Sequence, residues 1–332
     1  MKIKEEDIRP EKIFNEYLRL TEIDTQLYFS DTKREDINCP SCKTKGELWV
    51  EKQGFNYKIC PKCKTIFVSP RPNLLALNEY YTRAESTKFW ATTFYKITEQ
   101  ARREKLWKPK AQMIKDRLLT FQGINQFEFI IDIGGGYGIF VEEINKILDI
   151  NSIVIEPSSH LANICRSKNI HVIEKFMEDI KDSDLPKGRK CFVSFELFEH
   201  LHNPNTFLEV VNKNMNIGDM FILTTLSGTG LDIQILGEHS KSLSPPHHLN
   251  FFNPKSISNL LESAGFKVVE AITPGKLDVD IIKKQKSNIK DVFWSNIVDY
   301  LNEDELDKLQ DSIALLGLSS HMMITAFKID HD

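Results

Sequence analysis

The sequence predicts an α/β protein with a mainly parallel sheet, preceded by a smaller cysteine-containing unit. From residue 127 onward, apolar β-branched segments alternate with segments of helical periodicity, which is typical of a parallel sheet with crossover helices. A glycine-rich stretch at 134–138 follows the first of these strands. Two Cys-x-x-Cys pairs lie upstream, at 39–42 and 60–63, and indicate a separate small unit.

Composition and charge narrow the class of protein. The chain has 332 residues and a formal net charge of -4, and this acidic balance argues against a nucleic-acid binder. No apolar run reaches the ~18 residues of a membrane span, and the charged start MKIKEEDIRPEK lacks the apolar core of a signal peptide. We therefore expect a cytoplasmic protein without a membrane span.

Four regions follow one another along the chain. We expect an N-terminal helix at 1–35, a four-cysteine unit at 36–71, a helical linker or cap at 72–122, and an α/β domain at 123–332 with a helical insertion at about 276–318. The runs ELWV and TIFV predict short strands beside the cysteines, and SPRPN closes that unit. Pro109 is expected to start or kink a helix in the third region.

The α/β region divides into strands and helices of ordinary length. Strands are expected at 127–133, 151–156, 170–174, 191–196, 219–225, 267–272 and 321–328. Helices are expected at 138–148, 158–168, 204–215 and 254–264.

The cysteine pairs predict a structural zinc site. Cys39, Cys42, Cys60 and Cys63 form two knuckles with 17 residues between them, and together they supply the four thiolates that tetrahedral zinc requires. A closed four-thiolate site keeps no open position, so we expect no chemistry there. A redox dithiol is the alternative, but two matched pairs favour zinc.

The stretch "IIDIGGGYG" predicts a ligand site at the end of the first strand, where ligands of open α/β sheets bind. The dinucleotide fingerprint G-x-G-x-x-G fails here, because its third glycine position holds Ile139 or Val141. The pattern D-x-G-x-G-x-G begins at Asp132, which can organise the loop or meet a ligand's ammonium through water. Glu156 ends the second strand, and a carboxylate there can accept both hydroxyls of a ribose.

The stretches "IIDIGGGYGIF", "IEPSSHLANICRSKNI" and "SFELFEHLHNPNTFLEVV" resemble class I S-adenosylmethionine-dependent methyltransferases, especially the ubiquinone-type and sugar-modifying group. "SPPHHLNFFNPKSISNLLESAGFKVVE" resembles the segment after the fifth strand of that group. The cysteine unit is similar to that of methyltransferases of surface-polysaccharide and deoxysugar pathways. The resemblance implies a Rossmann-like class I sheet, mainly parallel with an antiparallel last strand, behind a zinc-ribbon-like unit and a helical cap.

The resemblance also implies a cofactor site. The glycines would line the methionine part of S-adenosylmethionine, Glu156 would hold the ribose, Phe176 and Met177 would flank the adenine, and Glu196 would close the site. A plain turn at the glycines, and a core role for Phe176 and Met177, are the alternatives. The expected cofactor residues are Asp132, Gly134, Gly135, Gly136, Gly138, Glu156, Pro157, Phe176, Met177 and Glu196.

Methyl transfer to an oxygen or carbon acid needs a general base, and histidine is the first candidate because its pKa lies near working pH. We expect His200, beside Glu199, in the active site, with His247 or His248 as the next choice. Glu199 and His200 could instead only order the loop. A catalytic cation held by His200, His202, His247 and His248 is a further alternative.

The sequence thus predicts an S-adenosylmethionine-dependent methyltransferase (EC 2.1.1.-) for a small acceptor, sugar-containing or nucleotide-activated, methylated on oxygen or carbon. One alternative is an RNA-modifying methyltransferase that uses the zinc unit as a reader. The other is a non-catalytic binding protein with a methyltransferase fold. The intact glycine loop and Glu156 argue against the latter. The oligomeric state stays open.

Overall fold

The structure is a computed structural model that describes residues 3–121 and 127–330. Its described residues form two compact units, each made of several chain segments. Among the described residues, unit 1 comprises 3–102, 226–257 and 272–322, and unit 2 comprises 103–121, 127–225, 258–271 and 323–330. The units therefore group the segments differently from the contiguous regions expected from the sequence, and the expected boundary at 122–123 lies outside the described residues.

Unit 2 is built on a seven-stranded sheet in the order β12-β13-β10-β9-β6-β7-β8. β6 to β10 pair in parallel, with β6 at the centre between β7 and β9. The backbone N–H of Gly218 donates to Lys328, and that of Ser227 donates to Ser320, so β13 runs antiparallel to β10. This confirms the predicted fold class. The strands are β6 (Phe129–Ile133), β7 (Asn151–Ile155), β8 (His171–Ile173), β9 (Lys190–Phe195), β10 (Met220–Leu226), β12 (Phe266–Ile272) and β13 (His321–Lys328).

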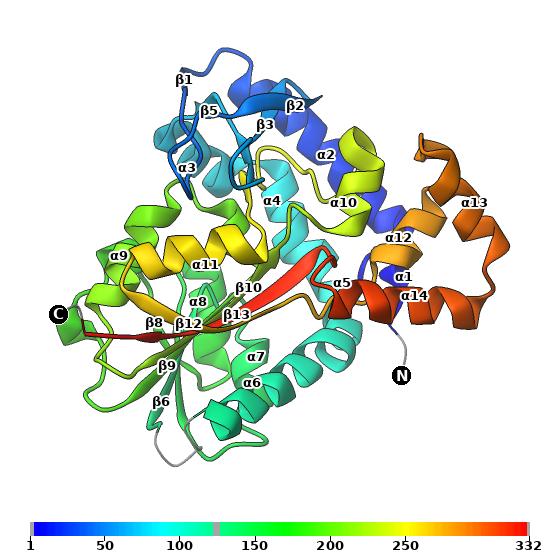
Figure 1. The fold of residues 1–332 in the computed structure, drawn as a ribbon. Coiled ribbons are helices and arrows are strands. Elements are labelled where there is room, and N and C mark those ends of the chain that lie inside the picture. The colour runs from blue at the N-terminus through cyan, green and yellow to red at the C-terminus, as the bar shows by residue number, and fades with distance from the viewer. Residues whose placement is uncertain (1–2, 122–126, 331–332) are drawn as a thin grey trace. The chain divides into compact units, whose positions relative to one another are not determined.

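Helices cover both faces of this sheet, because the strand order runs from β6 to β8 in one direction and through β9 to β10 in the other, and right-handed crossovers in opposite directions place their helices on opposite faces. In Figure 1, α6 and α7 lie on one face and α9 on the other. α7 is shorter than the expected 138–148, because it ends at Ile144 and a turn begins at Asn145. Pro109 lies in the first turn of α6, where proline is tolerated. The helices are α6 (Lys108–Phe121), α7 (Ile139–Ile144), α8 (Ser159–Ser167), α9 (Pro204–Lys213) and α11 (Pro254–Ser263).

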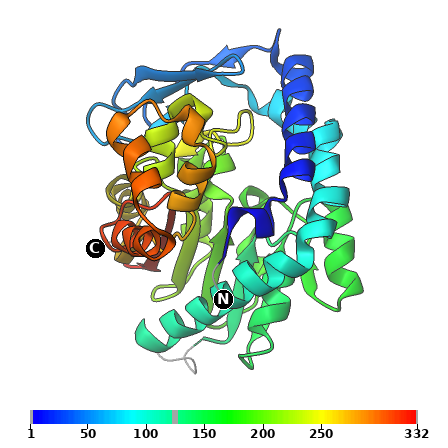
Figure 2. The same cartoon turned by 90° about the vertical axis from the view of Figure 1, so that its right-hand side faces the viewer.

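Unit 1 contains a second sheet, with strands in the order β11-β4-β3-β2, all antiparallel (β2 and β3 in blue in Figure 2). The expected strands ELWV and TIFV are confirmed. β3 was not predicted from the sequence, and neither was the pairing of residues 250–251 with β4. A small ribbon of β1 and β5 adjoins the cysteine region. The strands are β1 (Arg34–Glu35), β2 (Glu47–Lys52), β3 (Phe55–Ile59), β4 (Ile66–Val68), β5 (Arg71–Pro72) and β11 (Asn250–Phe251).

The remaining helices belong to unit 1. Residues 1–35 hold two helices rather than the single one expected, because Pro10 separates them and caps the second. The region of the expected insertion, about 276–318, holds the three helices α12 to α14. Two π-helical turns, Trp90–Phe94 and Arg103–Trp107, interrupt the helices between 85 and 121. The helices are α1 (Glu5–Ile8), α2 (Glu11–Phe29), α3 (Leu74–Arg83), α4 (Glu85–Phe89), α5 (Tyr95–Arg102), α10 (Leu231–Leu236), α12 (Asp278–Lys284), α13 (Val292–Tyr300) and α14 (Glu303–Leu315).

The aromatic side chains of the helical region form core. Phe94 is fully buried and stacks on Trp90, with ring centroids 4.3 Å apart, and both rings pack against Tyr17 of α2. Burying such rings stabilises the helices by roughly 2–3 kcal/mol each. Among residues 3–121 and 127–330, no helix combines the length and the apolar character that crossing a bilayer requires.

Candidate functional site

The glycine loop follows β6 in unit 2 and adopts a backbone that side chains would not tolerate. Gly134, Gly136 and Gly138 all have positive φ, between 55° and 73°. At Gly135, an added Cβ would lie 2.6 Å from a carboxylate oxygen of Asp132, which is shorter than any real contact. The loop therefore needs glycine both for its conformation and for the close approach of Asp132 beneath it.

Asp132 lies at the end of β6 and is 1% exposed. Its Oδ2 atom has no hydrogen-bond partner among the described residues. Burial raises the pKa of its carboxyl to about 7; the carboxylate of Glu156 adds to the shift and the ammonium of Lys110 opposes it. A buried polar atom without a partner is rare in folded proteins and points to a ligand or an ordered water at this place.

Glu156 follows β7, the strand next to β6, and its carboxylate points back to the glycine loop. One oxygen accepts the backbone N–H of Gly136 at 3.0 Å and the other accepts that of Ser158 at 2.9 Å. Burial raises the pKa of Glu156, while these two N–H groups oppose the shift. Pro157 is half-buried beside it. The structure thus brings Asp132, Glu156 and the glycines into one cluster, as expected from the sequence.

The two residues expected to flank an adenine differ in burial. Phe176 is 53% exposed, whereas Met177 is 3% exposed and begins a short 3₁₀ turn. An exposed ring can cover a bound base, but a buried thioether packs with the core. The role of each residue stays a prediction.

A second group of acids follows β9, the neighbour of β6 on its other side. Glu196 has a positive φ of 50° and accepts hydrogen bonds from Thr224 Oγ1 at 2.6 Å and Lys110 Nζ at 3.2 Å. Glu199 is 2% exposed and accepts the hydroxyl of Thr225 at 2.7 Å. Burial, and then the nearby carboxylate of Glu196, raise the pKa of Glu199.

His200 ends the 3₁₀ turn that begins at Phe198 and is half-buried. His200 and His202 belong to unit 2, whereas His247 and His248 belong to unit 1. A catalytic cation shared by these histidines stays an untested alternative.

His247 is part of a buried hydrogen-bond chain in unit 1. Its Nε2 lies 2.7 Å from the hydroxyl of Tyr80, which lies 3.0 Å from Ser86 Oγ. The backbone N–H of Ser86 in turn donates to Asp24 at 2.7 Å. His248 is held differently, with its Nδ1 2.7 Å from the backbone oxygen of Ser242. Tyr80 was not predicted from the sequence, because its position in α3 gives no sign of a partner 167 residues away.

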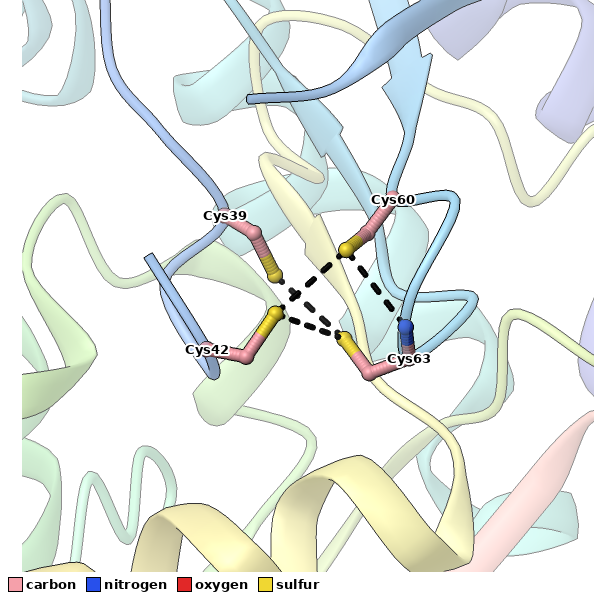
Figure 3. Close-up of side chains that lie close together, drawn as sticks. All are labelled: Cys39, Cys42, Cys60 and Cys63. Atoms are coloured by element: carbon pink, nitrogen blue, oxygen red, sulfur yellow. Dashed lines mark hydrogen bonds between the residues drawn. The ribbon is translucent and has the colours of Figure 1, made fainter. Parts of the chain in front are cut away.

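The four cysteines of the N-terminal region meet at one point in unit 1, with side chains directed toward each other (Figure 3). Their sulfur atoms all lie within 4.8 Å of one another, and three of the pairs are 3.4–3.5 Å apart. Zinc–sulfur bonds of about 2.3 Å would put tetrahedral sulfurs ~3.8 Å apart. None of the four is in a disulfide, so their chemistry and spacing fit a zinc ion.

The two knuckles have the same backbone conformation, which follows from the repeated sequence CP-x-CKT at 39–44 and 60–65. In each, the lysine after the second cysteine has a φ of 59° or 60°, and its N–H donates to the carbonyl of the first cysteine. Asn253 donates to the carbonyl of Cys63 at 2.7 Å, and Ser41 donates to that of Ser256 at 2.8 Å. The cluster therefore ties residues 253–256 to the N-terminal segment of unit 1.

Comparison with known proteins identifies the family of the chain. A family model described as "Methyltransferase domain" matches residues 101–271, just over half of the chain. A curated relative, the mitochondrial ubiquinone biosynthesis O-methyltransferase of Dictyostelium discoideum, is 24% identical over 172 residues, which cover 46% of this chain. The chain spans about half of that relative, 52% of its length.

Solved structures are also similar. A SAM-dependent methyltransferase from Archaeoglobus fulgidus is 20% identical with a TM-score of 0.43, over 68% of this chain and 97% of the other. An O-methyltransferase from a polyketide synthase of Brevibacillus brevis, in complex with S-adenosyl-L-homocysteine, is 14% identical with a TM-score of 0.46, over 71% and 76%.

Proposed function

Since the chain belongs to the methyltransferase domain family, we propose that it transfers a methyl group from S-adenosylmethionine to a small acceptor that is sugar-containing or nucleotide-activated. The family match confirms the methyltransferase domain predicted from the sequence. The observation that carries the proposal is the unpartnered, buried Oδ2 atom of Asp132 beneath a loop that only glycine can form.

The residues that follow β6, β7 and β8 fit the proposed cofactor. The open backbone of Gly134, Gly136 and Gly138 leaves room for the methionine part, and Asp132 supplies negative charge for an ammonium. Glu156 supplies a carboxylate for ribose hydroxyls, and the exposed ring of Phe176 supplies a face for the adenine. When bound, S-adenosylmethionine supplies a methyl group already activated by its sulfonium, so the protein's part is positioning and proton removal.

The acceptor loses a proton when an oxygen or carbon is methylated, so we propose a histidine base. His247 is the strongest candidate in unit 1, because Tyr80 fixes its ring at Nε2 and the chain to Asp24 holds Tyr80 in place. His200, beside Glu199, is the candidate in unit 2. Replacing each histidine by alanine distinguishes the two candidates. The variant that lacks the general base should lose most of its kcat and keep its cofactor affinity.

Zinc in the four-cysteine cluster is proposed as structural. Four thiolates complete its coordination and leave no position for a substrate. The cluster precedes β4, and Asn253, just after β11, donates to the carbonyl of Cys63.

The test is calorimetry with S-adenosylhomocysteine, followed by a screen of nucleotide sugars and free phenols with S-adenosylmethionine. Turnover on a nucleotide sugar supports the proposal. Turnover on a phenol and not on a nucleotide sugar would favour O-methylation of a phenolic acceptor instead. Tight RNA binding with a steep salt dependence would favour the RNA-modifying alternative, and cofactor binding without turnover on any acceptor would favour the non-catalytic one.

A further inference from the structure

We propose that Lys110 is a positioning residue of the cofactor site, which acts by holding the carboxylate of Glu196. This inference rests on the proposed function, since it concerns the same site. Lys110 lies in α6, before the first strand of the sheet, and no motif in the sequence marks it.

The contacts of Lys110 form a closed triangle. Its Nζ donates to Glu196 Oε1 at 3.2 Å and to Thr224 Oγ1 at 3.1 Å. Thr224 Oγ1 in turn donates to the same oxygen of Glu196 at 2.6 Å. Two donors on one carboxylate oxygen fix the direction of that side chain, and a charge-assisted donor is the stronger of the two.

The surroundings of the Lys110 ammonium leave it little room to move away from Glu196. The Lys110 side chain is 12% exposed, and its Nζ lies 5.2 Å from the ring centre of Trp107 and 4.7 Å from that of Phe195. Aromatic faces attract a cation, but they do not replace the hydrogen bonds it loses from water. The ammonium therefore needs Glu196 and Thr224.

Glu196 needs such support because its backbone is strained. Its φ of 50° lies in the left-handed region, which residues other than glycine seldom adopt. Its N–H donates to the carbonyl of Thr224 at 2.9 Å. Strained residues of this kind cluster at functional sites, where the surrounding structure holds them in place.

The triangle lies at the ligand-binding edge of the sheet. Phe195 ends β9, Thr224 lies near the end of β10, and β9 pairs with β6, which carries Asp132 and the glycine loop. The charge of Lys110 also opposes the rise in the pKa of Asp132, so the ammonium interacts electrostatically with that carboxyl. The Glu196 side chain is 39% exposed, so a ligand above the strand ends can reach it.

Calorimetric titration with S-adenosylhomocysteine tests this role in the full-length protein. Lys110→Met is expected to weaken binding roughly tenfold, as the loss of a charge-assisted contact predicts. Lys110→Arg, which keeps the charge, is expected to stay within about threefold of the wild type. Lys108→Met is the matched control, because Lys108 is on the same helix but pairs with the exposed Glu104.

A double-mutant cycle separates positioning from a general structural role. If Lys110 acts through Glu196, Lys110→Met has no further effect once Glu196 is changed, so the double variant with Glu196→Gln binds within about twofold of Glu196→Gln alone. Thr224→Val, which removes the other donor to Glu196, is expected to weaken binding in the same direction and covers the case in which Lys110→Met does not fold. Binding by Lys110→Met equal to that of Lys108→Met, or losses that multiply in the double variant, would overturn the inference. A wild type that does not bind S-adenosylhomocysteine would instead overturn the proposed function.

Discussion

The carboxylate of Glu156 accepts the backbone N–H of Gly136 at 3.0 Å, and so joins the ends of two adjacent parallel strands. Gly136 belongs to the loop after β6, and Glu156 follows β7. The contact holds the glycine loop in shape while the carboxylate stays at the ligand-binding edge. One side chain thus both shapes the loop and offers an acceptor to a ligand.

Glu156→Ala is therefore expected to weaken the binding of S-adenosylhomocysteine by more than about tenfold, because two charge-assisted hydrogen bonds to a ribose are lost and the glycine loop loses its tether. Isothermal calorimetry measures the effect. Glu174→Ala is the matched control, since Glu174 follows the next strand, β8, and is exposed. Unchanged affinity in Glu156→Ala would refute the placement of the ribose.

The raised pKa of Asp132 makes the stability of the cofactor-free protein depend on pH. Its pKa is raised to about 7 from an ordinary 3.8, chiefly by burial, so between these values the folded state holds a proton that the unfolded state has released. Stability therefore falls as pH rises from about 4 to about 7. Asp132→Asn lacks this term, so its unfolding free energy is expected to fall less steeply over that range.

Denaturant titrations at several pH values measure this difference. Burial also raises the pKa values of Glu199 and Asp232, so the wild type and Asp132→Asn share their contributions and the comparison isolates Asp132. Parallel pH curves for the two proteins would show that Asp132 does not carry the effect.

The α/β sheet was predictable because its signals are local. Each strand from β6 to β10 is a short apolar run, and the helices between them carry their own periodicity. The glycine loop was also predictable from the sequence, because positive φ angles and the close approach of the Asp132 side chain both favour glycine there. Clustering of the four cysteines followed from their spacing alone.

What the sequence did not reveal depends on contacts between distant segments. β11 is two residues long and pairs with β4, some 180 residues earlier, and no periodicity marks so short a strand. Lys110 and Tyr80 look like ordinary helix residues, because lysine and tyrosine are common on helices. Only the fold shows that their side chains reach Glu196 and His247.

Cys60→Ser is expected to abolish zinc binding, since a fourth thiolate is needed to close the tetrahedron. Elemental analysis should find about one zinc per chain in the wild type and in Cys191→Ser, the control at a buried cysteine outside the cluster. Hydrogen exchange should rise in β2 to β4 and in β11, but not in β6. Equal loss of protection in β6 would mean that the metal stabilises both units.

Tyr80→Phe tests the hydrogen-bond chain of unit 1. It removes one hydroxyl that serves both His247 and Ser86, so it leaves buried polar groups without their partner and should lower the free energy of unfolding by about 1–2 kcal/mol. Tyr81→Phe is the control, because the Tyr81 hydroxyl lies 3.5 Å from the backbone oxygen of His247, at the long limit of a hydrogen bond. Once an acceptor is known, Tyr80→Phe should also lower kcat while the affinity for S-adenosylhomocysteine stays at the wild-type value. A variant that loses stability but keeps full kcat would show that Tyr80 supports only the packing of unit 1, and the general base would then be sought at His200.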